Sequence, residues 1–163
     1  MRNRRFPIDL SSNMAVCDAN YIRILKLLPC FSLGATRKIS LPSLGPLDNS
    51  CLVTLQVEET FRYTSTIGIR FIFSGGHAPY FRPPALCMRL YHDASTAEVI
   101  SYQDHGGYHL NAQQGGRPEF TPDEKQQVNA FLAEWLMLCI EHGLSHHVPY
   151  EITRSEQSVP SLL

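Results

Sequence analysis

The sequence has no surplus of charge of either sign. Its 163 residues hold 14 Lys and Arg and 15 Asp and Glu, for a formal net charge of −1. General attraction to nucleic-acid backbones or anionic lipids depends on a surplus of positive charge, which this chain lacks. We therefore expect no nucleic-acid partner and no membrane partner. The only basic run, at Arg2, Arg4 and Arg5, is not followed by the apolar segment of a signal peptide.

Long apolar runs and paired cysteines are missing as well. The longest apolar run lies within residues 131–140 and is interrupted by Glu134, whereas a membrane span needs roughly 20 apolar residues. The five cysteines are odd in number and form no Cys-x-x-Cys pair, which is typical of buried thiols in a reducing compartment. These features predict a soluble, cytoplasmic protein.

No catalytic signature is present. The glycine pairs that begin at Gly75, Gly106 and Gly115 lack the Lys-Ser/Thr of a phosphate-binding loop, and no Gly-x-Gly-x-x-Gly follows a predicted strand. His105 and His109 have the spacing of a helical metal site, but two glycines lie between them and no cysteine stands near. We expect neither a cofactor nor a metal ion.

What is present is a helix at each end of a strand-rich middle. Near the start, apolar residues recur every three or four positions and predict a helix over residues 11–28. They are Leu10, Met14, Cys17, Tyr21, Leu25 and Leu28. Ser11, Ser12 or Asn13 can cap this helix, and Pro29 ends it.

The second helix has the stronger signal. Thr121 is its predicted N-cap, Pro122 stands at the first helical position, and Glu124 completes a capping box. Gly143 stands where a left-handed residue is wanted at the C-terminal end. The predicted apolar side holds Val128, Phe131, Leu132, Trp135, Leu138, Cys139 and His142.

Between the helices, alternating apolar and polar residues predict strands over residues 51–59 and 63–73 and a hairpin over residues 84–103. Weaker extended pieces fall near residues 37–41 and 108–111. We predict an α+β fold: an antiparallel sheet of four to five strands, with the N-terminal helix and the long C-terminal helix packed on one face. Residues 1–152 should form a single globular domain and residues 153–163 a disordered tail.

The hairpin carries the densest set of paired polar groups. A four-residue turn at residues 92–95 sets Arg89 opposite Glu98, with Tyr91 on the same face. A two-residue turn at residues 94–95 instead pairs Tyr91 with Glu98, and the sequence leaves both registers open. The simplest interpretation is a cross-strand ion pair and an Asp93 that caps its own turn, which contributes about 0–1 kcal/mol.

One set of segments has a recognisable order and spacing: Asn20-Tyr21, Leu27-Leu28-Pro29, Arg89-Leu90-Tyr91-His92-Asp93-Ala94, Ala97-Glu98-Val99, Glu124-Lys125, Asn129, Phe131-Leu132, Glu134-Trp135-Leu136, Cys139 and His142-Gly143. Together they resemble the YqiB-like family of uncharacterised bacterial proteins, a domain of unknown function. The resemblance spans roughly residues 14–143. It implies a small cytoplasmic bacterial protein and carries over no catalytic residue.

Two functional hypotheses follow from the hairpin. The first is a non-enzymatic binding or regulatory module that recognises a protein partner or a small anionic metabolite through Arg89, Tyr91, His92 and Glu98. The second is an enzyme acting on a nucleotide-like or phosphorylated small molecule, with Arg89 as anion clamp and His92 as acid/base. Asp93 is a further catalytic candidate in the same turn. A closed pocket containing both Arg89 and His92 would favour the enzyme, and a paired Arg89 on an open surface would favour the binding module.

Overall fold

The computed structural model describes residues 9–43, 50–74, 85–104, 107–110 and 121–145. The predicted disordered tail, the N-terminal arginines and most of the glycine-rich segment near residues 104–116 lie outside these ranges. No helix within the described ranges is both long and apolar enough to cross a membrane.

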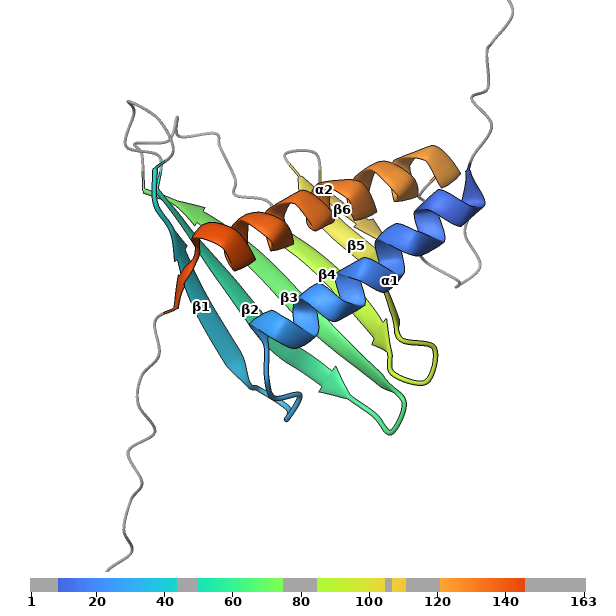
Figure 1. Cartoon of the computed structure of the whole chain (residues 1–163), viewed down its shortest axis with the longest axis horizontal. Helices are drawn as coiled ribbons and strands as arrows, with labels where there is room; N and C mark the ends of the chain where they lie inside the picture. The colour runs from blue at the N-terminus through green and yellow to red at the C-terminus, as the bar shows by residue number, and fades with distance from the viewer. Residues whose placement is uncertain (1–8, 44–49, 75–84, 105–106, 111–120, 146–163) are drawn as a thin grey trace, which may run out of the picture.

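Seven antiparallel strands form one sheet (Figure 1). Along the sheet their order is β6-β5-β4-β3-β2-β1-β7, so six consecutive strands form a meander and the last helix returns the chain to the opposite edge. The strands are β1 (Thr36–Leu41), β2 (Cys51–Thr60), β3 (Thr64–Phe73), β4 (Ala85–Tyr91), β5 (Thr96–Asp104), β6 (Gly107–Leu110) and β7 (Leu144–Ser145).

The predicted α+β class and antiparallel pairing are confirmed, and the predicted strand count is wrong. The additional strands lie at the two edges of the sheet, where β6 has four residues and β7 two. β6 falls on the weak extended piece predicted near residues 108–111. The two-residue β7 is too short for a readable alternation and depends on its pairing with β1.

The first helix, α1 (Leu10–Leu27), begins with a cap that differs from the prediction. Asp9 is the N-cap, and its side chain accepts a hydrogen bond from the backbone N–H of Ser12. None of the three residues predicted as caps fills that position. The helix ends as predicted, because Leu28 precedes Pro29 and adopts an extended conformation.

The buried side of α1 is rotated relative to the predicted stripe. Three stripe residues are exposed, namely Leu10, Met14 and Leu25. The buried side chains are Cys17, Asn20, Tyr21, Ile24, Leu27 and Leu28. The rotation arises because α1 contacts α2 along one flank as well as the sheet at β5.

The second helix, α2 (Pro122–His142), has the predicted capping box. The Thr121 side chain accepts from the Glu124 backbone N–H, and the Glu124 carboxylate accepts from the Thr121 backbone N–H. The left-handed C-terminus was predicted wrongly: Gly143 has φ −72° and ψ 132°, which is extended and leads into β7. The apolar side is also shifted, since the deepest residues are Asn129, Leu132, Leu136 and Cys139, while Phe131 and His142 are exposed.

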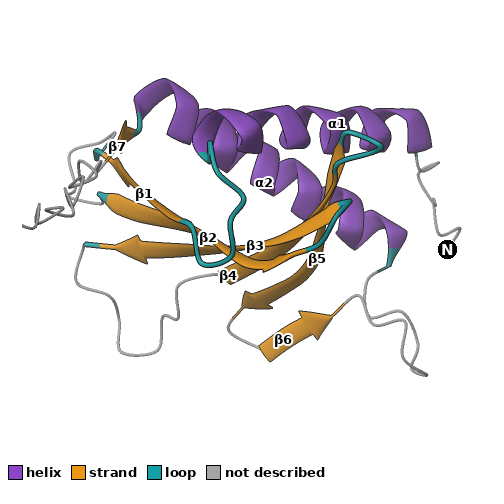
Figure 2. Cartoon of the chain, turned by 90° about the horizontal axis from the view of Figure 1, so that it is seen from below, coloured by secondary structure: helices purple, strands orange, loops and turns teal. Residues whose placement is uncertain are grey.

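Both helices lie over the same face of the sheet (Figure 2). This covered face contributes the alternating buried residues of the strands, among them Val53, Leu55, Ile67, Ile69, Phe71, Met88, Leu90 and Val99. Trp135 of α2 packs its ring against Phe71 and Phe73 at ring-centroid distances of 4.7 and 6.0 Å. On the other face, which we call the open face, no helix of the described ranges lies over the strands.

Candidate functional site

The β4–β5 hairpin has the register of the four-residue turn. Arg89 pairs with Glu98, Leu90 with Ala97, and Met88 with Val99, which confirms the first of the two predicted registers. Ser95 closes the turn with φ 53°, in the left-handed region. Leu90, Met88 and Val99 are buried on the covered face, so Arg89, Tyr91 and Glu98 lie together on the open face by strand alternation.

A β-bulge brings two further carboxylates to this part of the sheet. The pairing of β2 with β3 shifts between Val57 and Glu59, so Glu58 is an extra residue in β2. Glu59 accepts a hydrogen bond of 3.0 Å from the Thr66 hydroxyl and lies 3.8 Å from the Arg89 guanidinium. We call Glu58, Glu59, Arg89, Tyr91 and Glu98 the open-face cluster.

Arg89 is therefore paired with Glu59 on an open surface. The side chains of Arg89 and Glu59 are 40% and 52% exposed, so their ion pair is screened by water and contributes little to stability. Glu98, the cross-strand neighbour of Arg89, accepts a hydrogen bond of 3.0 Å from the Tyr91 hydroxyl. Burial, followed by the nearby Glu98 carboxylate, raises the pKa of Tyr91. Tyr91 thus remains a neutral hydrogen-bond donor at physiological pH.

Glu98 also ties the open face to α2. Its second oxygen lies 2.6 Å from the Lys125 ammonium. β6 pairs with β5 only over Ser101–Asp104, and the side chain of Asn129 accepts from the backbone N–H of Val99 on the remaining outer edge of β5. The N-terminal half of α2 therefore covers the edge that β6 leaves unpaired.

Glu58 and Cys87 fill the next row of the open face. The Cys87 thiol donates to Glu58 Oε2 at 3.8 Å, and the Glu58 carboxylate lies above Gly68, which has no side chain to displace it. Burial, with the Glu58 charge as the second cause, raises the pKa of Cys87 to about 11. Cys87 therefore stays a thiol near neutral pH and is not an activated nucleophile.

His92 lies on the other side of the sheet from Arg89. Its Nδ1 is 3.1 Å from the Tyr21 hydroxyl of α1, and its Nε2 is 2.8 Å from the Ser65 hydroxyl of β3. The rings of Tyr21 and Phe31 contact it edge-on at centroid distances of 5.9 and 5.4 Å. Both ring nitrogens are thus engaged: Nδ1 joins the hairpin turn to α1, and Nε2 joins it to β3.

Asp93 does not join either group. It is exposed in the turn, and its side chain makes no hydrogen bond with any residue of the described ranges. Of the four ligand-binding residues expected from the sequence, the structure brings together Arg89, Tyr91 and Glu98 and places His92 elsewhere. No three His, Cys, Asp or Glu residues of the described ranges stand close enough to hold a metal ion.

A protein-family model described as "Protein of unknown function (DUF1249)" matches residues 23–145. The chain belongs to this family. The match covers all the described strands, all of α2 and the last part of α1. Every residue of the open-face cluster therefore lies within the family's segment.

The similar proteins of this family are bacterial. The chain is 30% identical over 141 residues to "Uncharacterized protein YqiB" of Escherichia coli strain K12, an alignment that covers 86% of this chain and 94% of the relative. The YqiB proteins of the O6:H1 and O157:H7 strains match to the same extent. No solved structure is significantly similar to the chain.

A series of hydrogen bonds between buried polar groups was not predicted from the sequence. Arg23 donates to the Asn20 side chain, Asn20 donates to the backbone carbonyl of Asn129, and Asn129 accepts from Val99. Asn20 and Asn129 are both 0% exposed. An asparagine at a position that a helix buries is unfavourable unless it is hydrogen-bonded. The sequence does place an asparagine next to each predicted apolar stripe. Because the buried side of each helix is rotated from the predicted stripe, these two positions were not predicted to be buried.

Proposed function

We propose that this DUF1249 protein is a non-enzymatic binding or regulatory module that recognises a protein partner through the open face of its sheet. The partner would place one or more basic side chains against the open-face cluster. This proposal keeps the protein partner of the first hypothesis and replaces the anionic metabolite with a cationic surface.

The composition of the cluster is the observation that supports the proposal. Three carboxylates, those of Glu58, Glu59 and Glu98, share this part of the sheet with two cations: Arg89 lies 3.8 Å from Glu59, and Lys125 lies 2.6 Å from Glu98. The group therefore keeps a surplus of one negative charge. An anion approaching Arg89 would meet these carboxylates and would be repelled. An arginine or lysine from a partner would instead find acceptors that are partly exposed and held in place by Thr66 and Tyr91.

The rest of the open face adds a row with two cations and a row with two apolar residues. By strand register, Lys38, Thr54 and Arg70 lie in one row across β1, β2 and β3. Leu52 and Ile72 pair in the adjacent row, and Ile72 is 53% exposed. Positive charge at one end and negative charge at the other favour a partner in a single orientation, because electrostatic complementarity fixes register more than it adds affinity.

The enzymatic alternative lacks its main requirement. It needs Arg89 and His92 to face one ligand, but Arg89 lies on the open face and His92, in the turn after β4, lies on the covered side of the sheet. His92 is also engaged by Tyr21 and Ser65 through both nitrogens. A general base must reach the proton that it abstracts, so this arrangement favours a structural role for His92.

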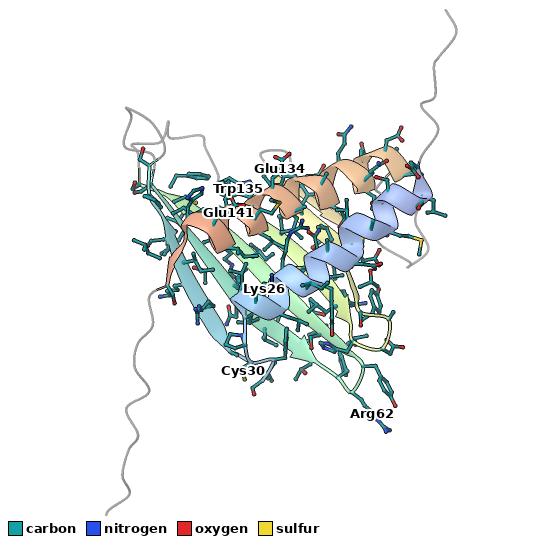
Figure 3. The ribbon with its side chains drawn as sticks, viewed as in Figure 1. Lys26, Cys30, Arg62, Glu134, Trp135 and Glu141 are labelled. Atoms are coloured by element: carbon teal, nitrogen blue, oxygen red, sulfur yellow. The ribbon has the colours of Figure 1, made fainter. Side chains whose placement is uncertain are left out.

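Site-specific photocrosslinking in living bacterial cells tests the proposal. Two variants each carry one photoreactive phenylalanine. In the first it replaces Gln56 of β2, on the open face, and in the second it replaces Glu134, which is exposed on α2 (Figure 3). We expect one discrete protein adduct from position 56 and none from position 134. An absence of any protein adduct from position 56 would contradict the proposal.

A charge reversal then links the adduct to the cluster. Glu59→Lys should abolish the adduct at position 56 and weaken binding to the purified partner by at least about tenfold, since it places like charges face to face. Glu134→Lys is the matched control, with the same charge change on an exposed helix position, and should leave binding unchanged. Equal binding by both variants would show that the cluster is not the recognition surface.

A further inference from the structure

A small pocket lies away from the open-face cluster, where the C-terminal ends of the two helices meet the β1–β7 edge of the sheet. Its volume is about 200 Å³. It is lined by Lys26 at the end of α1 (Figure 3), Arg37 of β1 and Ser145 of β7. Leu27 and Ile39 supply apolar walls.

The two cations of this pocket have no acidic partner within the described ranges. No Asp or Glu lines the pocket, and neither Lys26 nor Arg37 makes an ion pair with a described residue. Arg37 Nε is shielded from solvent and has no hydrogen-bond acceptor among the described residues. A shielded, unpaired guanidinium nitrogen is unfavourable, because its hydration is lost without a replacement.

Lys26 and Arg37 can neutralise the partial negative charges at the C-terminal ends of α1 and α2, but their combined charge is larger than this role needs. Each helix C-terminus carries roughly half a negative charge, and α1 and α2 both end at the pocket. Two full positive charges against two halves leave a surplus of about one positive charge. Cys139 adds no negative charge, because burial and then the neighbouring Cys51 raise its pKa to about 12.

We propose that this pocket binds a small monocarboxylate whose carboxylate lies between Lys26 and Arg37 and whose short apolar part contacts Leu27 and Ile39. The surplus of about one charge matches a monoanion better than a phosphate, which carries about two negative charges at neutral pH. The guanidinium plane of Arg37 suits a planar carboxylate, and Ser145, a residue with a hydroxyl donor, also lines the pocket.

The size of the pocket limits the ligand. At roughly 30 Å³ for each water molecule in the liquid, about 200 Å³ corresponds to about seven waters. A carboxylate with a chain of a few carbons fits within this volume. This site is distinct from the proposed protein-binding surface and goes beyond that proposal, because Arg37 lies on the covered side of β1 whereas Lys38 lies on the open side.

Titration of the full-length chain with butyrate, followed by NMR, tests the proposal. We expect saturable shifts of the backbone amides of Leu27, Arg37 and Ser145. Butyramide, the neutral analogue, should produce none, and inorganic phosphate should bind more weakly than butyrate. Absence of saturable butyrate shifts at millimolar concentrations, or equal shifts with butyramide, would overturn the proposal.

Matched substitutions in β1 complete the test. Arg37→Met should raise the butyrate Kd by roughly 10- to 100-fold, the range expected for loss of a charged hydrogen-bond donor. Lys38→Met removes a charge from the next residue and should leave the Kd within about twofold. Unchanged butyrate affinity in Arg37→Met would overturn the proposal.

Stability measurements separate ligand binding from a merely structural role for Arg37. The thermal midpoint of Arg37→Met without butyrate should equal or exceed that of the parent chain, because the variant removes an unpaired shielded nitrogen. Lys26→Met gives a second test. Lys26 is exposed, so the substitution should leave the thermal midpoint unchanged while weakening butyrate binding several-fold. A lowered midpoint in Arg37→Met together with unchanged butyrate affinity in Lys26→Met would assign both cations to the helix ends alone.

Discussion

On the covered side of the sheet, Asn129 is 0% exposed and its side chain accepts a hydrogen bond from the Val99 backbone N–H at the β5 edge. On the open side, Arg89 is 40% exposed and its partner Glu59 is 52% exposed. Both are polar contacts between elements distant in sequence. A buried polar group that loses its partner costs about 1–3 kcal/mol, whereas an exposed ion pair contributes about 0–1 kcal/mol.

The difference between the two faces separates stability from binding. The polar groups under the helices are needed to hold α1, α2 and β5 together. Those on the open face can exchange their partners for water or for another protein with little change in the free energy of unfolding. Substitutions placed in pairs across the sheet can therefore test the comparison directly.

The largest expected effect is that of Asn129→Ala. The substitution leaves the Val99 backbone N–H without its acceptor and removes the donor to the Lys125 carbonyl, so the free energy of unfolding should fall by about 2–4 kcal/mol. Urea denaturation measures this change in the free energy of unfolding, provided that the m-value is the same in the variant and the parent chain. Gln127→Ala, at an exposed position of the same helix, is the control, and a similar small loss in both variants would contradict the role of Asn129.

Gly143→Ala should have the next largest effect. An added Cβ would lie 2.2 Å from the Cys139 carbonyl oxygen and 2.5 Å from Ile39 Cγ2. Because the nearest of these atoms is helix backbone, the junction between α2 and β7 must shift, and we expect a loss of about 1–3 kcal/mol. Thermal denaturation of the variant measures this loss. An unchanged midpoint would show that the helix end and β7 adjust freely.

A smaller effect is expected from adjacent residues of β3 that face opposite sides. Ser65→Ala removes the hydroxyl that contacts His92 Nε2 under the helices, and should cost about 0.5–1.5 kcal/mol. Thr66→Val removes the donor to Glu59, whose carboxylate remains in contact with water, and should cost less than about 0.5 kcal/mol. Urea denaturation of both variants compares them, and a larger loss for Thr66→Val would reverse the assignment of the two faces.

Gly68→Ala should have the smallest effect, although its added Cβ would also lie 2.2 Å from another atom. That atom is Glu58 Oε1, at the end of an exposed side chain that can swing into solvent. Although Gly68 itself is buried, only this exposed side chain has to move, so the free energy of unfolding should change by less than about 0.5 kcal/mol. A loss as large as that of Gly143→Ala in the same denaturation experiment would show that the Glu58 side chain is rigidly held.

Part of the candidate site follows from the sequence, because strand alternation is a local property. The period of two places Arg89 and Tyr91 on one face of β4, and either of the two predicted turn lengths sets Glu98 opposite one of them on that same face. The sequence leaves two turn lengths open. The structure has the longer, four-residue turn, and in it His92 contacts Tyr21 and Ser65. Glu59 could not be predicted, because the bulge at Glu58 that aligns it with Arg89 depends on pairing between β2 and β3.

The sequence by itself determined the α+β class, the limits of the main strands, the capping box at Thr121 and the end of α1 at Pro29, since each depends on residues within a few positions of one another. Only the tertiary structure decided which side of each helix is buried, because each helix contacts both the sheet and the other helix. It also decided that Asn20 and Asn129 meet, and that Lys26 and Arg37 share a pocket. Asn20 and Asn129 are far apart along the chain, and Lys26 and Arg37 lie on a helix and a strand with a loop between them. Both juxtapositions come from packing rather than from any local pattern.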